Sequence, residues 1–203
     1  MRMESMTKTE EKIILAATDI FLEKGKDGAR MQEIADRAGL NKAMLHYYFR
    51  SKDNLYYEVF GAQIQKFFDD LSDAIGETDN FSDFLWVFIS NYIDFVAPKN
   101  KLVRFILWEI EKGGNMVANI LKQNLHDGNQ QNNFLVQKVE KAIQEKQIRS
   151  VDPVNFVISL IGMCVFPFIG RPILENVYES TRILTPEFLE QRKYEVYHLI
   201  WDG

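Results

Sequence analysis

The sequence predicts an all-α protein of about nine helices, in which a three-helix head precedes a larger helical domain. Only 5 of its 203 residues are proline and 11 are glycine, so few long breaks interrupt the chain. Apolar side chains recur at the 3.6-residue spacing of amphipathic helices, and no strand-like alternation lasts more than a few residues. Because 46% of the residues are hydrophobic, a sizeable core is expected.

The first helix is expected from Thr7 to Lys24. Thr7 and Glu10 have the spacing of a capping box, in which each side chain binds the backbone amide of the other residue. Apolar residues then follow at helical spacing on one face, and Gly25 ends the pattern.

A helix-turn-helix is expected directly afterwards. We predict a second helix from Met31 to Ala38 and a third from Lys42 to about Phe49. Gly39 allows a left-handed turn between them, and Asn41 is a good N-cap for the third helix. Leu40 would fill the angle between the two helices. In a helix-turn-helix the later helix lies in the major groove of DNA.

The rest of the chain is placed by caps and breaks. A long helix runs from Lys52 toward Ile75, and two later helices begin at an N-cap followed by proline, Asp152-Pro153 and Thr185-Pro186. The polar segment 76–80 is the predicted domain boundary. It divides the chain into a head at 1–53, a connecting helix at 54–75 and a C-terminal domain at 76–203.

Charge is unevenly distributed along the chain. The net charge is −5, which taken alone argues against a general nucleic-acid-binding protein. Between Lys24 and Lys52, however, seven cations stand against three anions, so this segment carries about +4 and the remainder about −9. A small basic region on an acidic body is typical of a protein that contacts DNA at one end only.

We expect a cytoplasmic protein without a membrane span. The N-terminus has no apolar signal-peptide core, and the longest apolar run, Val157 to Ile169, is short and interrupted. The single cysteine, Cys164, has no partner for an internal disulfide, which favours a reducing compartment and a place in the core.

The residues around the helix-turn-helix resemble the N-terminal signature of the TetR family of transcriptional regulators. The matching positions are Ile34-Ala35, Ala38-Gly39, Leu45, Phe49, Ser51-Lys52-Asp53 and Leu55. The resemblance extends over about residues 8 to 60, and beyond them only length and helix order agree. It implies a two-fold symmetric dimer whose subunits each have a DNA-binding head and a core with a ligand pocket. It also implies that the ligand moves the head through the fourth helix.

The third helix is expected to offer its outer face to base edges. Lys42, His46 and Tyr47 are available for this face, while Leu45 and Phe49 turn toward the core of the head. The resemblance implies DNA contacts, by position, for Lys42, Ala43, Met44, His46, Tyr47, Tyr48 and Lys52. Of these, Lys52 would hold a phosphate, whereas Tyr48 has packing inside the head as an equal alternative.

The second helix adds two candidates for DNA contacts. Arg30 stands where the family often has a threonine that caps this helix; arginine does not cap in that way, but it can reach a phosphate. Gln32 is placed to reach either backbone or base. Met44 and His46 also depart from the family's usual residues, so the operator sequence of a relative does not transfer.

The C-terminal domain is expected to bind an apolar or aromatic small-molecule effector. Its aromatic residues recur at helical intervals, and ordinary core packing is the simplest explanation at any one position. A few of them are nevertheless expected to line a pocket. The candidate lining residues are Phe88, Tyr92, Phe105, Trp108, Glu109, Met163 and Phe166.

A homodimer is expected through the helices near 154–178 and 186–201. The segment Val154–Ile169 is apolar nearly all round, and such a helix is buried on all faces. In a chain of this size, part of that burial would come from another subunit.

The sequence predicts a regulator rather than an enzyme. Its histidines and its cysteine are scattered, without metal-ligand spacing or a phosphate-binding glycine loop, so no metal or cofactor is expected besides the effector. The predicted function is a ligand-responsive, sequence-specific repressor that binds a palindromic operator in double-stranded DNA. The alternative is a helical dimeric receptor or protein-interaction module without DNA binding, for which the unusual Arg30, Met44 and His46 leave room.

Overall fold

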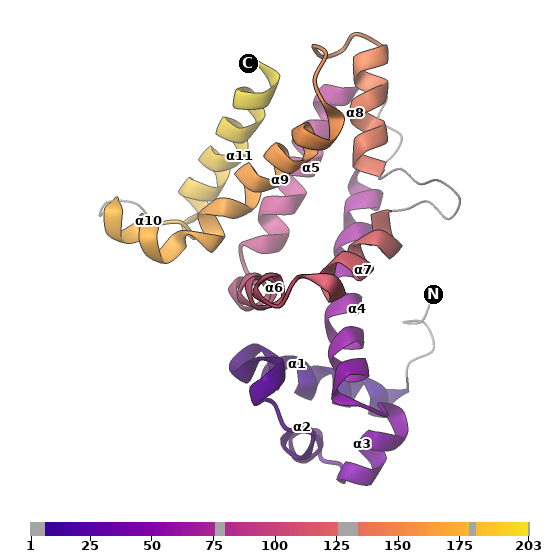
Figure 1. Ribbon diagram of the computed structural model, residues 1–203. Coiled ribbons are helices and arrows are strands. Elements are labelled where there is room, and N and C mark those ends of the chain that lie inside the picture. Colours follow the sequence, from indigo (N-terminus) through magenta and orange to yellow (C-terminus); the bar gives the residue numbers. More distant parts are fainter. Residues whose placement is uncertain (1–6, 76–79, 126–133, 179–181, 203) are drawn as a thin grey trace. The chain divides into compact units, whose positions relative to one another are not determined.

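In a computed structural model, the described residues 7–75, 80–125, 134–178 and 182–202 form eleven α-helices and no strand (Figure 1). The sequence predicts about nine. Two more arise because the stretch 115–146 forms two helices and because Gly170 separates a long helix from a short one. The helices are α1 Lys8–Gly28, α2 Met31–Arg37, α3 Lys42–Tyr48, α4 Lys52–Ile75, α5 Phe81–Val96, α6 Asn100–Glu111, α7 Asn115–Leu125, α8 Phe134–Gln144, α9 Pro153–Ile169, α10 Arg171–Val177 and α11 Pro186–Trp201.

The chain folds as two compact units. The first comprises Met1–Lys66 and Trp108–Ile120, and the second comprises Phe67–Leu107 and Leu121–Gly203. The structural divisions therefore fall inside α4, α6 and α7, whereas the sequence places its divisions at residues 53 and 75. The predicted linker at 76–79 and the predicted break near Asp127 lie outside the described residues.

The first unit has a core built around α1. α2 packs against α1, and α3 packs against α2. The start of α4 meets α1 through the edge-to-face rings of Phe21 and Tyr56, whose centroids are 4.8 Å apart. The aliphatic side chains buried by this packing include Ile13, Ile20, Ile34, Leu45 and Leu55. Each contributes about 1.5–3 kcal/mol to folding, and all five belong to the first unit.

Both ends of α1 follow from the sequence. The Thr7 Oγ1 accepts the backbone N–H of Glu10 at 3.2 Å, and the Thr7 N–H donates to the Glu10 carboxylate at 2.8 Å, which completes the predicted capping box. Helical geometry is interrupted at Gly25, with φ 70° and ψ 173°, and one further turn extends to Gly28. Glycine adopts this positive φ readily because it has no Cβ.

α5 is the centre of the second unit. It packs against α8, α9 and α11, and α9 in turn contacts α8, α10 and α11. The buried side chains include Phe84, Leu85, Phe88, Ile89, Leu160 and Val196. Both predicted proline starts are confirmed, with Asp152 capping α9 and Thr185 capping α11 through their side-chain oxygens. Cys164 is buried as predicted, and burial raises the pKa of its thiol to about 12.

Two polar contacts join α11 to α5. The buried Lys193 donates to Asp94 on α5 at 2.7 Å and to Glu190 on its own helix at 2.6 Å. The hydroxyls of Ser82 and Tyr197 lie 2.5 Å apart. Because a buried ammonium is stable only when it is paired, Lys193 helps to fix the register of the two helices.

No single described helix is both long and apolar enough to cross a membrane. α9 and α10 pass that test only together, and they are bent by 70° at the break between them.

Candidate nucleic-acid interface

The turn between α2 and α3 is a Schellman motif. The Leu40 N–H donates to the Ala35 carbonyl at 2.9 Å, and the Gly39 N–H donates to the Asp36 carbonyl at 3.1 Å. Gly39 has a φ of 70°, in the region that favours glycine. Asn41 then caps α3 by accepting a backbone N–H of that helix at 2.8 Å. The predicted turn glycine and N-cap are both confirmed.

α3 presents two unlike faces. Leu45 is fully buried, and Phe49 at the C-cap is buried as well, so these two side chains hold α3 against the head. On the outer face the Tyr47 side chain is 81% exposed. The other exposed residues of α3 are Lys42, Ala43, Met44 and His46. Tyr48 is half-buried, and its ring meets that of Tyr47 edge to face at 5.4 Å.

Four cations of the basic segment are engaged within the head. The ion pairs are Lys24 with Glu33 at 2.8 Å, Lys26 with Asp53 at 3.1 Å and Arg37 with Glu23 at 3.2 Å. Lys52 donates to backbone carbonyls. The local excess of positive charge in the sequence therefore overstates what is available to a partner.

Three cations of the same segment have no such engagement. Arg30, Lys42 and Arg50 are exposed, and none has an ion pair or a side-chain hydrogen bond among the described residues. Arg30 and Lys42 belong to the predicted DNA-contacting set. Arg50 does not, and its place directly after α3 is the one sequence signal that points to it. These three side chains are the ones that the fold leaves free to meet an anion.

Lys52 and Gln32 both make contacts within the head. The Lys52 Nζ donates to the carbonyls of Ala29 at 3.2 Å and Asp27 at 3.4 Å, which joins the start of α4 to the turn between α1 and α2. The sequence pattern does not predict this role. Gln32 is exposed and donates to Asp36 at 2.7 Å. Arg30 occupies the N-cap of α2 without a side-chain cap, as the sequence predicts.

The seven candidate ligand-binding residues are distributed over both units. Trp108 and Glu109 belong to the first unit, and the other five belong to the second. Phe88 and Phe105 are buried, whereas Phe166 is exposed. Tyr92 packs against the core of the second unit, where burial raises the pKa of its hydroxyl, and Met163 lines a surface hollow.

The end of α6 is anchored within the first unit. Glu109 is only 6% exposed and accepts a hydrogen bond from the Tyr56 hydroxyl at 3.1 Å. Burial and the Glu109 charge raise the pKa of that hydroxyl, so it stays protonated and donates. Lys112 pairs with Asp27 at 2.5 Å. The Trp108 ring lies 3.0 Å from where a Cβ on Gly25 would stand, so a larger residue there would require the ring to shift.

Comparisons with known proteins agree with this geometry. Residues 13–59 match the family model described as bacterial regulatory proteins of the tetR family. The HTH-type transcriptional activator FasR of Mycolicibacterium smegmatis is 30% identical over 94 residues, which are 46% of this chain and 43% of FasR. The chain thus spans less than half of that relative.

Solved structures share the fold over nearly the whole chain. The fatty acid degradation regulator FadR of Bacillus halodurans is similar with a TM-score of 0.74 at 17% identity, over 97% of this chain and 96% of that one. The regulator FadR of Bacillus subtilis in complex with stearoyl-CoA has a TM-score of 0.68 at 20% identity, over 95% and 98%.

A helix-turn-helix whose third helix is exposed, in an all-helical fold, is typical of DNA-binding regulators. The head therefore matches the DNA-binding domain of the TetR family, and the relatives that are similar to this chain are transcriptional regulators. The family model matches the head alone, and the solved structures share the fold of the second unit as well.

Proposed function

We propose that the protein is a ligand-responsive repressor that acts in the cytoplasm without catalysis and binds a palindromic operator as a homodimer. The observation that carries this proposal is the outer face of α3. Tyr47 and Lys42 are exposed there, while Leu45 on the opposite side holds the helix in the head. Such a helix enters a major groove with its outer side chains against base edges.

The exposed residues divide into two kinds of DNA contact. Arg30, Lys42 and Arg50 supply charge to phosphates, and this term makes binding steeply dependent on salt. Tyr47 and Met44 face base edges, where an apolar contact with a thymine methyl is available to Met44. Lys52, which is bonded to the turn between α1 and α2, positions the head and contributes to all DNA sequences alike.

Dimerisation is proposed through α9 and α11. α9 exposes Val154 and Ile158, and Ile158 is 62% exposed. α11 exposes Tyr194 and Leu199. A monomer would leave these large apolar side chains in water, whereas a second copy of the chain would cover them. The sequence-based expectation of an interface near 154–178 and 186–201 rests on the same residues.

The proposed effector is an apolar molecule with an acyl chain. The fold is shared with a FadR that was solved with stearoyl-CoA. The interior of the second unit is rich in aromatic side chains, among them Phe88 and the partly buried Tyr92. Such an interior favours an apolar ligand with few polar groups.

The anchored end of α6 is proposed to couple the effector to the head. Glu109 is bonded to Tyr56 on α4, and Lys112 is paired with Asp27 next to the turn between α1 and α2. A displacement of α6 would therefore move α4 and that turn together. Coupling of this kind is reciprocal, so operator DNA weakens effector binding as much as the effector weakens operator binding.

The test is a selection of tight binders from a random duplex DNA pool at two salt concentrations. We expect an inverted repeat to be enriched. With that operator, Tyr47→Ala and Lys42→Ala should each weaken binding by about tenfold and relax sequence preference, whereas Lys52→Ala should weaken operator and random DNA equally. Lys122→Ala, which removes an exposed cation of the second unit, is the control and should have no effect. Folded protein that enriches no sequence at low salt would instead support an interaction module without DNA binding.

A further inference from the structure

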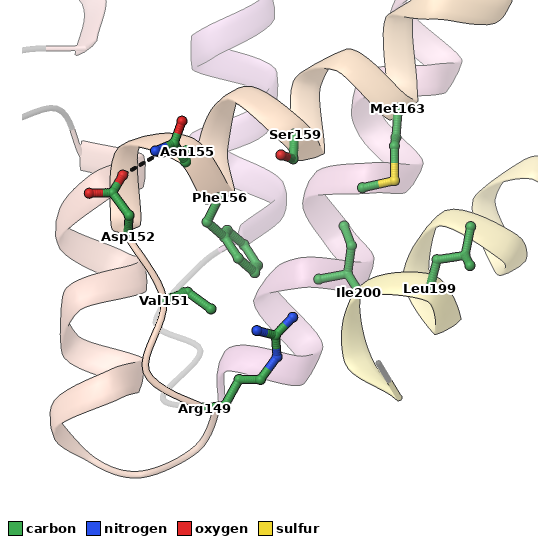
Figure 2. A pocket seen from close by; sticks show the side chains of 9 residues that line it. All are labelled: Arg149, Val151, Asp152, Asn155, Phe156, Ser159, Met163, Leu199 and Ile200. Carbon is green, nitrogen blue, oxygen red and sulfur yellow. Dashed lines mark hydrogen bonds between the residues drawn. The ribbon is translucent and has the colours of Figure 1, made fainter.

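A groove on the surface of the second unit borders the proposed dimer interface, with which it shares Leu199. It consists of two hollows of about 290 Å³ and 500 Å³, which share Arg149, Val151, Phe156 and Ile200. The groove lies between the loop after α8, the start of α9 and the end of α11. Figure 2 shows the Arg149 guanidinium directed toward Phe156 and Ile200. The combined size is that of a small-molecule site, for which roughly 300–1,000 Å³ is usual.

The groove has an apolar wall with hydrogen-bonding groups beside it. The apolar lining residues are Ile148, Val151, Phe156, Met163, Leu199, Ile200 and Trp201. Two of the polar groups come from α9, whose segment Pro153–Ile169 contains one amide and one hydroxyl side chain, Asn155 and Ser159. Both of them line the groove. Polar side chains on an otherwise apolar helix are thus placed where a ligand would meet them.

Two cations in the groove are without partners. Lys146 and Arg149 are exposed lining residues, and among the described residues neither has an ion pair or a side-chain hydrogen bond. Lys146 also has a φ of 59°, the left-handed conformation that glycine usually adopts at a helix end. Strained backbone of this kind is found disproportionately at functional sites.

The nearby carboxylates form no ion pair with these cations. Asp152 accepts a backbone N–H at the start of α9 at 2.8 Å, and Asp202 lies 2.5 Å from the ring nitrogen of His198. Glu145 accepts from the side-chain amide of Gln147 at 2.8 Å. Each carboxylate is already engaged by a neighbour within the fold and none is paired with Lys146 or Arg149, so both cations remain available to a ligand.

We propose that this groove binds a small organic anion with an apolar body. The anionic group lies against Arg149 and Lys146, and the body packs against Phe156, Ile200 and Trp201. A guanidinium is well suited to a carboxylate because it offers parallel N–H donors. The site is distinct from the aromatic interior proposed for the effector, and it does not depend on DNA binding.

The test uses the full chain labelled with 5-fluorotryptophan and observed by ¹⁹F NMR. Of its three tryptophans, Trp201 lines the groove, and Trp201→Phe assigns its resonance. The probe is 2-naphthoate, and its neutral analogue 2-naphthamide is the matched ligand control. We expect 2-naphthoate to shift the Trp201 resonance saturably and the Trp86 and Trp108 resonances much less.

Two variants decide whether Arg149 binds the anion. Arg149→Met should weaken 2-naphthoate about tenfold, as the loss of a charge-assisted hydrogen bond does, whereas Lys122→Gln should leave the affinity unchanged. The amide should bind about tenfold more weakly than the acid. An unmoved Trp201 resonance in the parent protein overturns the proposal, and this is also the result if a second copy of the chain covers the groove. Equal affinity in Arg149→Met overturns it as well.

Discussion

Two surfaces of the molecule expose large apolar side chains, and the charges beside them distinguish the two. On α3, Met44 and Tyr47 are exposed together with Lys42, and Arg50 follows directly. On α9, Val154 and Ile158 are exposed on a helix whose segment Pro153–Ile169 contains no charged residue. A polyanion favours the first kind of surface, and a second copy of the chain favours the other. Exposure alone thus does not identify a partner, because the neighbouring charges decide it.

A charge placed on the α9 surface tests whether this surface binds a second copy of the chain, and it should have the largest effect on the affinity of the dimer. In the proposed dimer, Ile158→Glu buries an unpaired carboxylate, which costs about 3 kcal/mol or more and weakens the dimer more than a hundredfold. Sedimentation equilibrium measures the dissociation constant. Ile110→Glu is the control, since Ile110 is another exposed isoleucine but lies in the first unit. If both variants associate like the parent protein, the α9 surface is not the interface.

Loss of the hydrogen bond between Tyr56 and Glu109 should have the next largest effect. Both residues belong to the first unit, and the quantity affected is the free energy of unfolding. Tyr56→Phe leaves the buried Glu109 carboxylate without this donor, so the free energy of unfolding should fall by about 1.5–3 kcal/mol in urea titrations. Adding Glu109→Leu should recover part of the loss, because the buried charge is then removed too. Additive losses in the double variant would show that the two residues are not coupled.

The fold could be predicted largely from the sequence because its helix ends are determined by local chemistry. Thr7, Asn41, Asp152 and Thr185 cap their helices as expected, and Gly39 supplies the expected left-handed turn. Each of these contacts joins residues within a few positions of one another. The division of the chain into units could not be predicted in this way, because it depends on residues at the end of α6 that contact α4 and α1, 53 and 85 positions earlier in the chain.

The outer face of α3 could be predicted for a similar reason, since helical spacing separates Leu45 from Tyr47 within three positions. The roles of the cations could not. A lysine in a sequence looks the same whether it pairs with a carboxylate, as Lys24 does, or remains free, as Lys42 does. The contacts of Lys52 with the Ala29 and Asp27 carbonyls span more than twenty residues, and no local pattern encodes them.

Two helix ends, one in each unit, have the same backbone conformation but different residues. Gly39 in the head and Lys146 in the second unit both adopt a positive φ after a helix, and in both cases the next residue's N–H returns to the helix. In this conformation the Cβ of Lys146 is sterically unfavourable, whereas glycine has no Cβ. Lys146→Gly should therefore raise the free energy of unfolding by about 1 kcal/mol. Lys146→Ala, which keeps the strain, should change it little, and a stabilised alanine variant would contradict this explanation.

The smallest effect concerns two carboxylates whose pKa values lie below the ordinary value. In the head, the hydrogen bond from Lys24 lowers the pKa of Glu33, and in the second unit the backbone N–H of Ile183 lowers that of Glu175. A carboxyl with a lowered pKa in the folded state stabilises fully above its unfolded pKa of 4.5. That stabilisation is lost as the pH falls through the folded pKa.

The urea midpoint should therefore fall between about pH 5 and about pH 3, and Glu33→Gln or Glu175→Gln should make the decline shallower. Added salt should distinguish the contribution of Glu33 in the first unit from that of Glu175 in the second. The partner of Glu33 is a charged lysine on an exposed surface, so high salt should weaken its contribution. The first partner of Glu175 is a neutral amide, whose hydrogen bond salt screens much less. An equal salt response of both variants would mean that charge rather than hydrogen bonding controls both carboxylates.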